Sequence, residues 1–256
     1  MWYLLIPPLL SITLALVSGS VLTGVVSFVL LSIPIGLGIF LVGMPFFSRP
    51  VLRVRTKRPL VAITFDDGPD PAYTRHILGI LKEHGARATF FVVAQNARRH
   101  PDIIREIVSG DHEISNHSAA HRHLLSLLPP HTQLDDIRTA QRTIEEIAGV
   151  SPRFYRPPMG YKTPGTFWAA RRLGLTVAGW DVRGWDTVIT DPERIAAHVL
   201  ARARPGSIIL LHDAPTLNGR FADRSAVVKA LSPILLELKA RGMSCVTLSE
   251  LMSSAR

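Results

Sequence analysis

The chain has 256 residues and a formal net charge of +9, and none of its charged side chains lies within residues 1–48. Hydrophobic residues make up 47% of the chain and fall in periodic runs, which excludes an intrinsically disordered protein. The single cysteine, Cys245, excludes a disulfide framework.

Residues 1–48 predict a transmembrane segment of one or two helices. A spanning helix needs roughly 20 apolar residues, and two stretches come near this length, at residues 2–18 and 21–46, separated by a Ser-Gly-Ser triplet. The first stretch is short and contains a Pro-Pro pair, so one span preceded by an interfacial segment is the alternative. A cleaved signal peptide is disfavoured, because no basic residue precedes the apolar stretch and the stretch is too long.

Residues 49–59 predict a basic juxtamembrane linker. Five basic side chains follow the apolar segment directly: Arg49, Arg53, Arg55, Lys57 and Arg58. Such a cluster attracts anionic lipid headgroups, at about 1 kcal/mol per residue. The chain has no zinc-finger, RNP-like or basic-helix pattern. We therefore expect a membrane as a partner, and no nucleic acid.

From residue 60 onward, short β-rich runs alternate with longer amphipathic ones. The predicted strands are Leu60–Phe65, Ala88–Val93, His112–Ser115, Arg153–Arg156, Leu175–Trp180, Ser207–Leu211 and Met243–Thr247. The predicted helices are Tyr73–His84, Asp102–Ser109, Thr132–Ala148, Pro164–Leu173, Pro192–Ala203 and Ala226–Ala240. This alternation predicts an α/β fold with a parallel sheet of seven strands, either open or closed into a barrel.

Polar side chains follow most of these strands at the point where each strand ends. They are Asp66 and Asp67 after the first strand, His117 and His121 after the third, Arg156 at the end of the fourth, Asp181 after the fifth, and His212 and Asp213 after the sixth. Because the carboxyl ends of parallel strands meet at one rim, where α/β folds build their active sites, we expect these groups to lie together.

The Asp66-Asp67 pair indicates a metal site. Two adjacent carboxylates resist joint ionisation unless a cation is close. A metal resolves the conflict if one aspartate binds it while the other accepts a proton. The alternative interpretation is an Asx turn that caps the next helix.

Two histidines, His117 and His121, are spaced i and i+4. On a helical turn they would share one face, and Asp67 would complete a His₂Asp set of the kind found in catalytic zinc sites. Solvated or helix-capping histidines are the alternative, and the nearby His112 and His123 make the pair less distinctive.

Two further motifs lie on the same rim. Arg156 opens a stiff Arg-Pro-Pro-Met-Gly loop, where it could hold a carboxylate ionised or be a surface residue of a rigid connector. His212 ends an apolar strand, which suggests a general acid or base, or else a structural histidine. The aromatic residues of Trp180–Thr187 could line a sugar-binding groove or belong to the core.

In this order, Thr-Phe-Asp-Asp-Gly, His-Ser-x-x-His, Arg-Pro-Pro-x-Gly and Leu-x-His resemble the polysaccharide deacetylase family, also called the NodB-homology domain or carbohydrate esterase family 4. The resemblance covers about residues 60–251 and predicts residues 60–256 as the deacetylase domain. It implies a distorted (β/α) barrel, a divalent metal that is most often zinc, and removal of acetyl groups from glycans such as peptidoglycan or chitin oligomers.

The resemblance also implies roles for individual residues. Asp67, His117 and His121 match the metal ligands, Asp66 the general base and His212 the general acid. Arg156 matches the residue that holds the base, and the backbone N–H of Met159 the oxyanion donor.

One motif departs from the family pattern. The family usually has Asp-x-x-Asp-Trp where this chain has Arg183-Gly184-Trp185-Asp186-Thr187. Asp186 is expected to orient His212 and completes the predicted catalytic set. Arg183, Trp185 and Tyr161 are the predicted substrate contacts, and Arg183 could meet a phosphate or carboxylate.

The sequence thus predicts a membrane-anchored, metal-dependent hydrolase that removes N-acetyl groups from a glycan. Within the enzyme class, the alternative is a deacylase of a lipid-linked sugar at the membrane face. In another class, the alternative is a non-catalytic glycan-binding protein. The basic flank favours a cytoplasmic domain, whereas the family's role favours an extracytoplasmic one. The sugar, the acyl group and the oligomeric state stay open.

Overall fold

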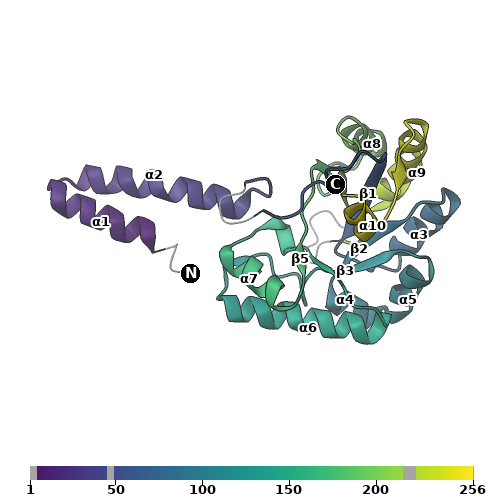
Figure 1. Ribbon diagram of the computed structural model, residues 1–256, viewed down its shortest axis with the longest axis horizontal. Coiled ribbons are helices and arrows are strands. Elements are labelled where there is room, and N and C mark those ends of the chain that lie inside the picture. Colours follow the sequence, from purple (N-terminus) through teal and green to yellow (C-terminus); the bar gives the residue numbers. More distant parts are fainter. Residues whose placement is uncertain (1–4, 45–48, 216–222, 256) are drawn as a thin grey trace.

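The computed structural model describes residues 5–44, 49–215 and 223–255, which form a helical hairpin joined to an α/β domain (Figure 1). The strands are β1 (Leu60–Asp66), β2 (Ala88–Val92), β3 (Glu113–Asn116), β4 (Phe154–Tyr155), β5 (Thr176–Val177), β6 (Val182–Arg183), β7 (Ile208–His212) and β8 (Ser244–Cys245). The α-helices are α1 (Ile6–Ser18), α2 (Val21–Phe40), α3 (Thr74–Glu83), α4 (Ala94–Arg99), α5 (Pro101–Ser109), α6 (Pro130–Ala148), α7 (Pro164–Arg172), α8 (Pro192–Leu200), α9 (Ser225–Ala240) and α10 (Leu248–Ser253).

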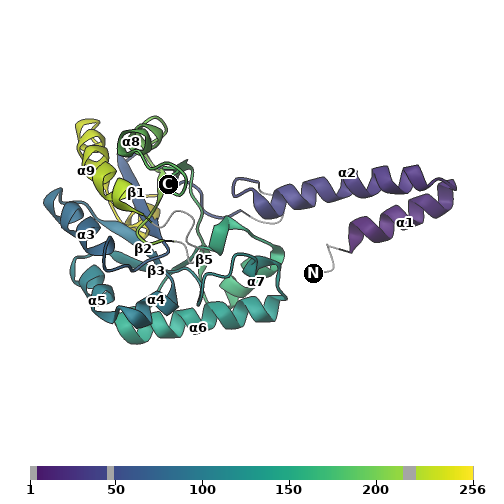
Figure 2. The same cartoon turned by 180° about the vertical axis from the view of Figure 1, so that it is seen from behind.

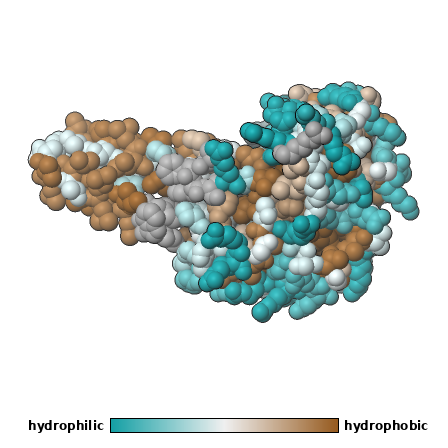
Figure 3. All heavy atoms as spheres, viewed as in Figure 1, coloured by the Kyte–Doolittle hydropathy of each residue, from teal (hydrophilic) through white to brown (hydrophobic). Residues whose placement is uncertain are grey.

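The N-terminal helices α1 and α2 lie side by side and project from the domain in both views (Figures 1 and 2). Gly19, in a left-handed conformation, ends α1, and the side chain of Ser20 caps the start of α2. The helices approach closely at Gly24, where an added Cβ would lie 2.7 Å from Cβ of Ala15. Their surface is largely apolar (Figure 3). By length and composition, α2 is long and apolar enough to cross a membrane, whereas α1 has only 13 residues.

The sheet confirms the prediction of a distorted barrel of about seven parallel strands. Its order is β5-β4-β3-β2-β1-β7-β6, every pairing is parallel, and β8 pairs separately with the start of β1. Among the described residues, β5 and β6 are the two edges, so the curled sheet is not closed by a pairing between them.

Two expectations for residues 175–181 are wrong: the length of the predicted strand, and the position of Asp181 at the rim. The predicted strand Leu175–Trp180 is reduced to Thr176–Val177, and an unpredicted strand, β6, follows at Val182–Arg183. Asp181 therefore precedes a strand instead of ending one. Its carboxylate accepts hydrogen bonds from Ser207 and the N–H of Ile208, at the start of β7 and away from the rim.

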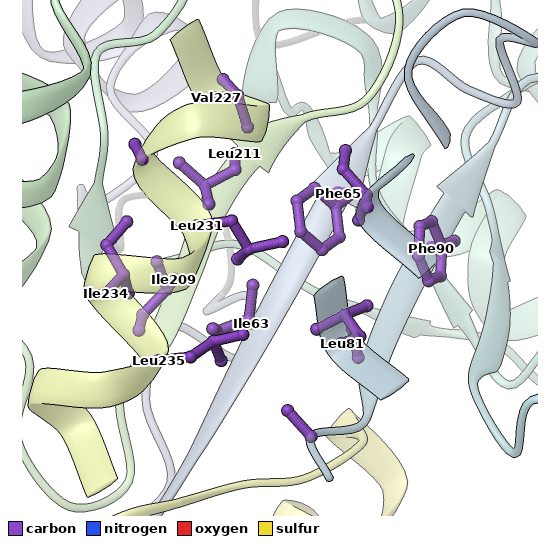
Figure 4. Close-up of a cluster of buried hydrophobic side chains, with 14 of the residues drawn as sticks. Ile63, Phe65, Leu81, Phe90, Ile209, Leu211, Val227, Leu231, Ile234 and Leu235 are labelled. Carbon is purple, nitrogen blue, oxygen red and sulfur yellow. The ribbon is translucent and has the colours of Figure 1, made fainter. Parts of the chain in front are cut away.

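The core lies between β1, β7 and the helices outside them (Figure 4). Side chains alternate along β1, so Ile63 and Phe65 face the helices, whereas Thr64 and Asp66 face the barrel interior. Leu231 and Leu235 of α9 pack against this face. Hydrophobic burial on one face of β1 thus directs its polar residues to the other.

Residues 49–59, the predicted linker, make backbone contacts with the α/β domain. Val51 pairs with Ala178 beside β5, and Arg53 pairs with Ser207 at the start of β7. The Arg53 guanidinium also donates to the carbonyl of Pro205. The basic segment is therefore fastened beside the edge strand β5 and at the start of β7.

We expect Leu231→Ala to lower the free energy of unfolding by about 2–5 kcal/mol, because it leaves a cavity in the core. The matched control is Leu236→Ala, on the exposed face of the same helix, with an expected change within about 0.5 kcal/mol. Urea unfolding of the full chain in detergent, followed by tryptophan fluorescence, measures both. Equal effects would contradict the assignment of the core.

Candidate active site

Two buried carboxylates, Asp66 and Asp67, lie at the carboxyl end of β1. Asp66 is the last residue of the strand, and Asp67 turns the chain with a left-handed φ of 80°. Gly68 is required next, because an added Cβ would lie 2.2 Å from an oxygen of Asp213. The carboxylate of Asp213 accepts hydrogen bonds from the N–H of Gly68 and from Thr74, so it braces the turn.

Asp67, His117 and His121 form a compact buried cluster. Each offers one ligand atom, and these atoms lie within 4.8 Å of one another. Asp67 Oδ1 is 3.4 Å from His117 Nε2 and 3.1 Å from His121 Nε2. Neither contact has hydrogen-bond geometry, and both carboxylate oxygens of Asp67 are buried without a partner among the described residues.

The expectation of a helical turn between the two histidines is wrong. Residues 117–121 form an irregular loop after β3, with left-handed φ at Ser118 (75°) and His121 (49°). The Ser118 hydroxyl accepts a hydrogen bond from the N–H of His121 and stabilises this loop. A loop conformation, and not helical periodicity, brings the rings together, with 4.9 Å between their centroids.

The electrostatics of the cluster suit a metal. Burial alone would raise the pKa of Asp67, but His117, followed by His212 and His121, holds that pKa well below its ordinary value. Burial lowers the pKa of His121 to about 4, so its imidazole is neutral at pH 7, the form that binds metals. Burial alone would lower the pKa of His117, but Asp66 and Asp67 raise it, so a bound cation would take the place of the proton on Nε2, while Nδ1 donates to the carbonyl of Arg156 at 2.7 Å. These residues fit a divalent cation.

Asp66 has a different partner. Arg156 Nη1 donates to Asp66 Oδ1 at 2.5 Å, and the guanidinium also donates to Thr64 Oγ1 and to the carbonyl of Gly179. Its Cζ lies 3.9 Å from the centroid of the Phe91 ring, and the side chain is fully buried. A buried arginine held on several sides fixes Asp66 beside the cluster through this ion pair.

His212, at the end of β7, is held by Asp186. Its Nδ1 lies 3.0 Å from Asp186 Oδ2, and its backbone N–H donates to the same oxygen at 2.8 Å. Burial alone would lower the pKa of His212, but the charge and hydrogen bond of Asp186, together with the charges of Asp67 and Asp66, outweigh burial and raise that pKa. The loop carrying Asp186 is fixed by the buried Arg224, which donates to the carbonyls of Asp186 and Ala214.

These groups open into one pocket of about 320 Å³. Its lining includes Asp66, Asp67, His117, His121 and His212, together with Met159, Tyr161, Arg183 and Thr187. Met159 has a left-handed φ of 59°, and no described residue accepts a hydrogen bond from its backbone N–H. That N–H is therefore available to a ligand.

The structure places two of the three predicted substrate contacts in the pocket. Arg183 and Tyr161 line the pocket, whereas Trp185 lies outside the lining and is 44% exposed. The guanidinium of Arg183 lies over the Trp185 ring, 4.4 Å from its centroid, and donates to Thr187. Trp185 thus supports Arg183 from outside.

Sequence reasoning gave no role to three residues of this site: Thr64 contacts Arg156, and Phe40 and His123 line the pocket. Trp180, which could have been a groove or a core residue, lines the pocket beside Arg156. Only Thr64 carried a usable signal, because it lies two residues before Asp66 and so on the same face of β1. His123 lies next to His121 but is not part of the ligand cluster.

Comparisons with known proteins agree with this geometry. The family model for polysaccharide deacetylase matches residues 53–178. A peptidoglycan-N-acetylglucosamine deacetylase from Bacillus cereus is 36% identical over 203 residues, which cover 78% of this chain and 91% of that protein. A chitooligosaccharide deacetylase from a Bradyrhizobium species is 35% identical over 197 residues, covering 75% and 90%. A solved CE4 family pseudoenzyme from Bacillus anthracis has a TM-score of 0.73 at 25% identity, covering 81% of this chain and 70% of that one.

The curled parallel sheet, with a His/Asp cluster and an acid–base pair at its rim, defines a hydrolase of the mixed α/β class with a candidate metal site. The chain belongs to the polysaccharide deacetylase family, as the motifs predict. It is a hydrolase of carbon–nitrogen bonds other than peptide bonds.

We expect His121→Gln to weaken binding of a divalent metal by more than about tenfold, because it removes one of three protein ligands. His123→Gln is the matched control and should bind metal as the unchanged chain does, because His123 is outside the cluster. Isothermal titration of the full chain in detergent with zinc measures both affinities. Equal loss in the two variants would show that the cluster is misassigned.

Proposed function

We propose that this protein is a membrane-anchored, metal-dependent deacetylase that hydrolyses the N-acetyl group of a glycan. One observation carries the proposal: two adjacent buried aspartates have different nearest partners, Arg156 for Asp66 and the two histidines for Asp67, with His117 farther from Asp66, at 3.8 Å, than from Asp67, at 3.4 Å. The names of the relatives support N-acetylated glycans as substrates, whether peptidoglycan or chitin-like. Helix α2 would supply the anchor, residues 49–59 the linker, and residues 60–256 the catalytic domain.

Asp67, His117 and His121 would hold the metal, and their His₂Asp chemistry favours zinc. When bound, the metal would polarise the acyl carbonyl and make water more acidic. Asp66 is the general base, because it lies beside the cluster and its ion pair with Arg156 fixes its position there. It removes the proton from the attacking water.

His212 donates the proton that the departing nitrogen needs, and Asp186 keeps it protonated and oriented. The free N–H of Met159 stabilises the developing oxyanion. The acyl carbon gains the hydroxyl of water, its bond to nitrogen breaks, and the products are acetate and a free amine on the sugar.

A non-catalytic glycan-binding protein is the competing proposal, since a structural relative is a pseudoenzyme. The described residues weigh against it. The base, the three ligands, the arginine, the acid and its aspartate are all present and in contact. A binding protein has no need of this complete set.

The test is acetate release by the full chain from N-acetylated oligosaccharides. We expect release that a chelator abolishes and added zinc restores. His212→Gln should lower kcat by about 10²–10⁴-fold with metal content unchanged, because it removes the proton donor alone. Bound metal without any release from these glycans or from lipid-linked sugars would favour the binding protein.

The pH dependence provides a second test. In Asp186→Asn the charge that raises the pKa of His212 is lost, so that pKa falls and less of the acid form is present at neutral pH. We expect the alkaline limb of the profile of kcat/KM against pH to move to lower pH. An unmoved limb in an active variant would exclude His212 as the acid that Asp186 supports.

A further inference from the structure

Helix α2 ends directly on the active-site loop. The ammonium of Lys162 is buried and donates to the carbonyls of Gly38 and Leu41, at the carboxyl end of the helix. The backbone N–H of Lys162 donates to the carbonyl of Ile39 at 3.0 Å. A cation at this end of a helix satisfies its free carbonyls and suits its dipole. The contact therefore joins the helix firmly to the segment that follows Met159.

The end of α2 is also a wall of the catalytic pocket. Phe40, the last residue of the helix, lines the pocket that holds Asp66, Asp67 and His212. Its ring meets that of Tyr161 edge to face, with 4.9 Å between centroids. Beyond it, the side chain of Val42 packs so closely that an added Cβ at Gly160 would lie 2.6 Å away.

This junction places the pocket at the membrane boundary. The 20 residues of α2 span about 30 Å at 1.5 Å per residue, the thickness of the hydrocarbon core. Phe40 is then at the level where that core meets the headgroups. A side chain that lines the catalytic pocket therefore lies at the bilayer surface.

Exposed apolar side chains occur in the pocket lining and close to it in sequence, as expected of such a position. Among the described residues after residue 60, seven large apolar side chains are exposed. Four of them belong to the pocket or flank its lining in sequence: Leu124, Met159, Trp185 and Val188. Exposed tryptophan with aliphatic neighbours is typical of surfaces that meet headgroups.

The pocket also contains a cation with no carboxylate partner. Arg183 makes no ion pair with any residue in the described part of the chain, and its Nε has no acceptor there. Stacking on Trp185 and the bond to Thr187 hold it in place. An arginine fixed in this way suits an anionic group on the ligand, and at a membrane surface the phosphate of a lipid-linked sugar is such a group.

We propose that the natural substrate is an N-acylated sugar joined through phosphate to a lipid embedded in the membrane. The inference rests on the proposed function, and it names the substrate of that same site. The lipid stays in the bilayer beside α2, the phosphate meets Arg183, and the sugar enters the pocket past Phe40. Water cleaves the amide as described above, which releases the carboxylic acid and leaves the amine on the lipid-linked sugar.

The test uses the full chain in phosphatidylcholine nanodiscs. The probes are N-acetylglucosamine on a polyprenyl phosphate, the same sugar on a phosphate-free polyprenol, and chitotetraose in solution. At equal concentration we expect acetate release from the phosphate-linked probe to be at least about tenfold faster than from chitotetraose. Equal or faster release from chitotetraose overturns the lipid inference and leaves the deacetylase intact. No release from any probe overturns the proposed function itself.

Two variants test the parts of the site. Phe40→Ala should slow release from the phosphate-linked probe about tenfold, because the variant removes a wall of the pocket. Phe28→Ala, with nearly the same exposure in the same helix, is the matched control and should stay within about twofold. Equal rates in the two variants would show that Phe40 does not contribute to substrate binding in the pocket.

The variant Arg183→Gln tests recognition of the phosphate separately from recognition of the lipid. We expect the preference for the phosphate-linked probe over the neutral polyprenol probe to fall at least about tenfold, the value of a lost charged hydrogen bond. An unchanged preference for the phosphate-linked probe would show that Arg183 does not bind the phosphate. Thermal unfolding of each variant confirms that it is folded.

Discussion

The adjacent buried carboxylates of Asp66 and Asp67 are the constraint on which the rest of the site depends. Two negative charges removed from water at neighbouring positions repel each other, and burial penalises each of them. They persist because each faces a different set of positive or metal-binding groups: the guanidinium of Arg156 on one side, and two imidazoles on the other. These different surroundings suit two chemically identical side chains to different roles, proton transfer for Asp66 and metal binding for Asp67.

The fold supplies these partners from the ends of separate strands. Asp66 ends β1 and Asp67 follows it, the histidines follow β3, Arg156 follows β4 and His212 ends β7. Because all these strands are parallel and lie in one curled sheet, their ends converge on one pocket. The helical hairpin adds a further wall through Phe40, so the same loop that carries Met159 also receives the end of α2.

Much of this arrangement could be predicted, because it depends on local pattern. Short apolar, β-rich runs place β1 and β7, and parallel topology then brings Asp67, His117 and His121 to one rim. The backbone between the histidines could not be predicted, since left-handed φ at Ser118 and His121 is imposed by the loop's own hydrogen bonds. Strand β6 has only two residues and no periodic signal, and its pairing with β7 decides that Asp181 faces away. The Lys162 contact with α2 joins residues more than a hundred positions apart, and no sequence pattern reports it.

The most direct test of the central claim compares Asp66→Asn with Asp67→Asn in the full chain, measuring bound metal and acetate release in each. The account predicts that both variants lose release and that only Asp67→Asn loses metal, because Arg156 and the histidines assign the carboxylates to different tasks. Equal metal loss in both variants, or normal release by Asp66→Asn, would contradict it.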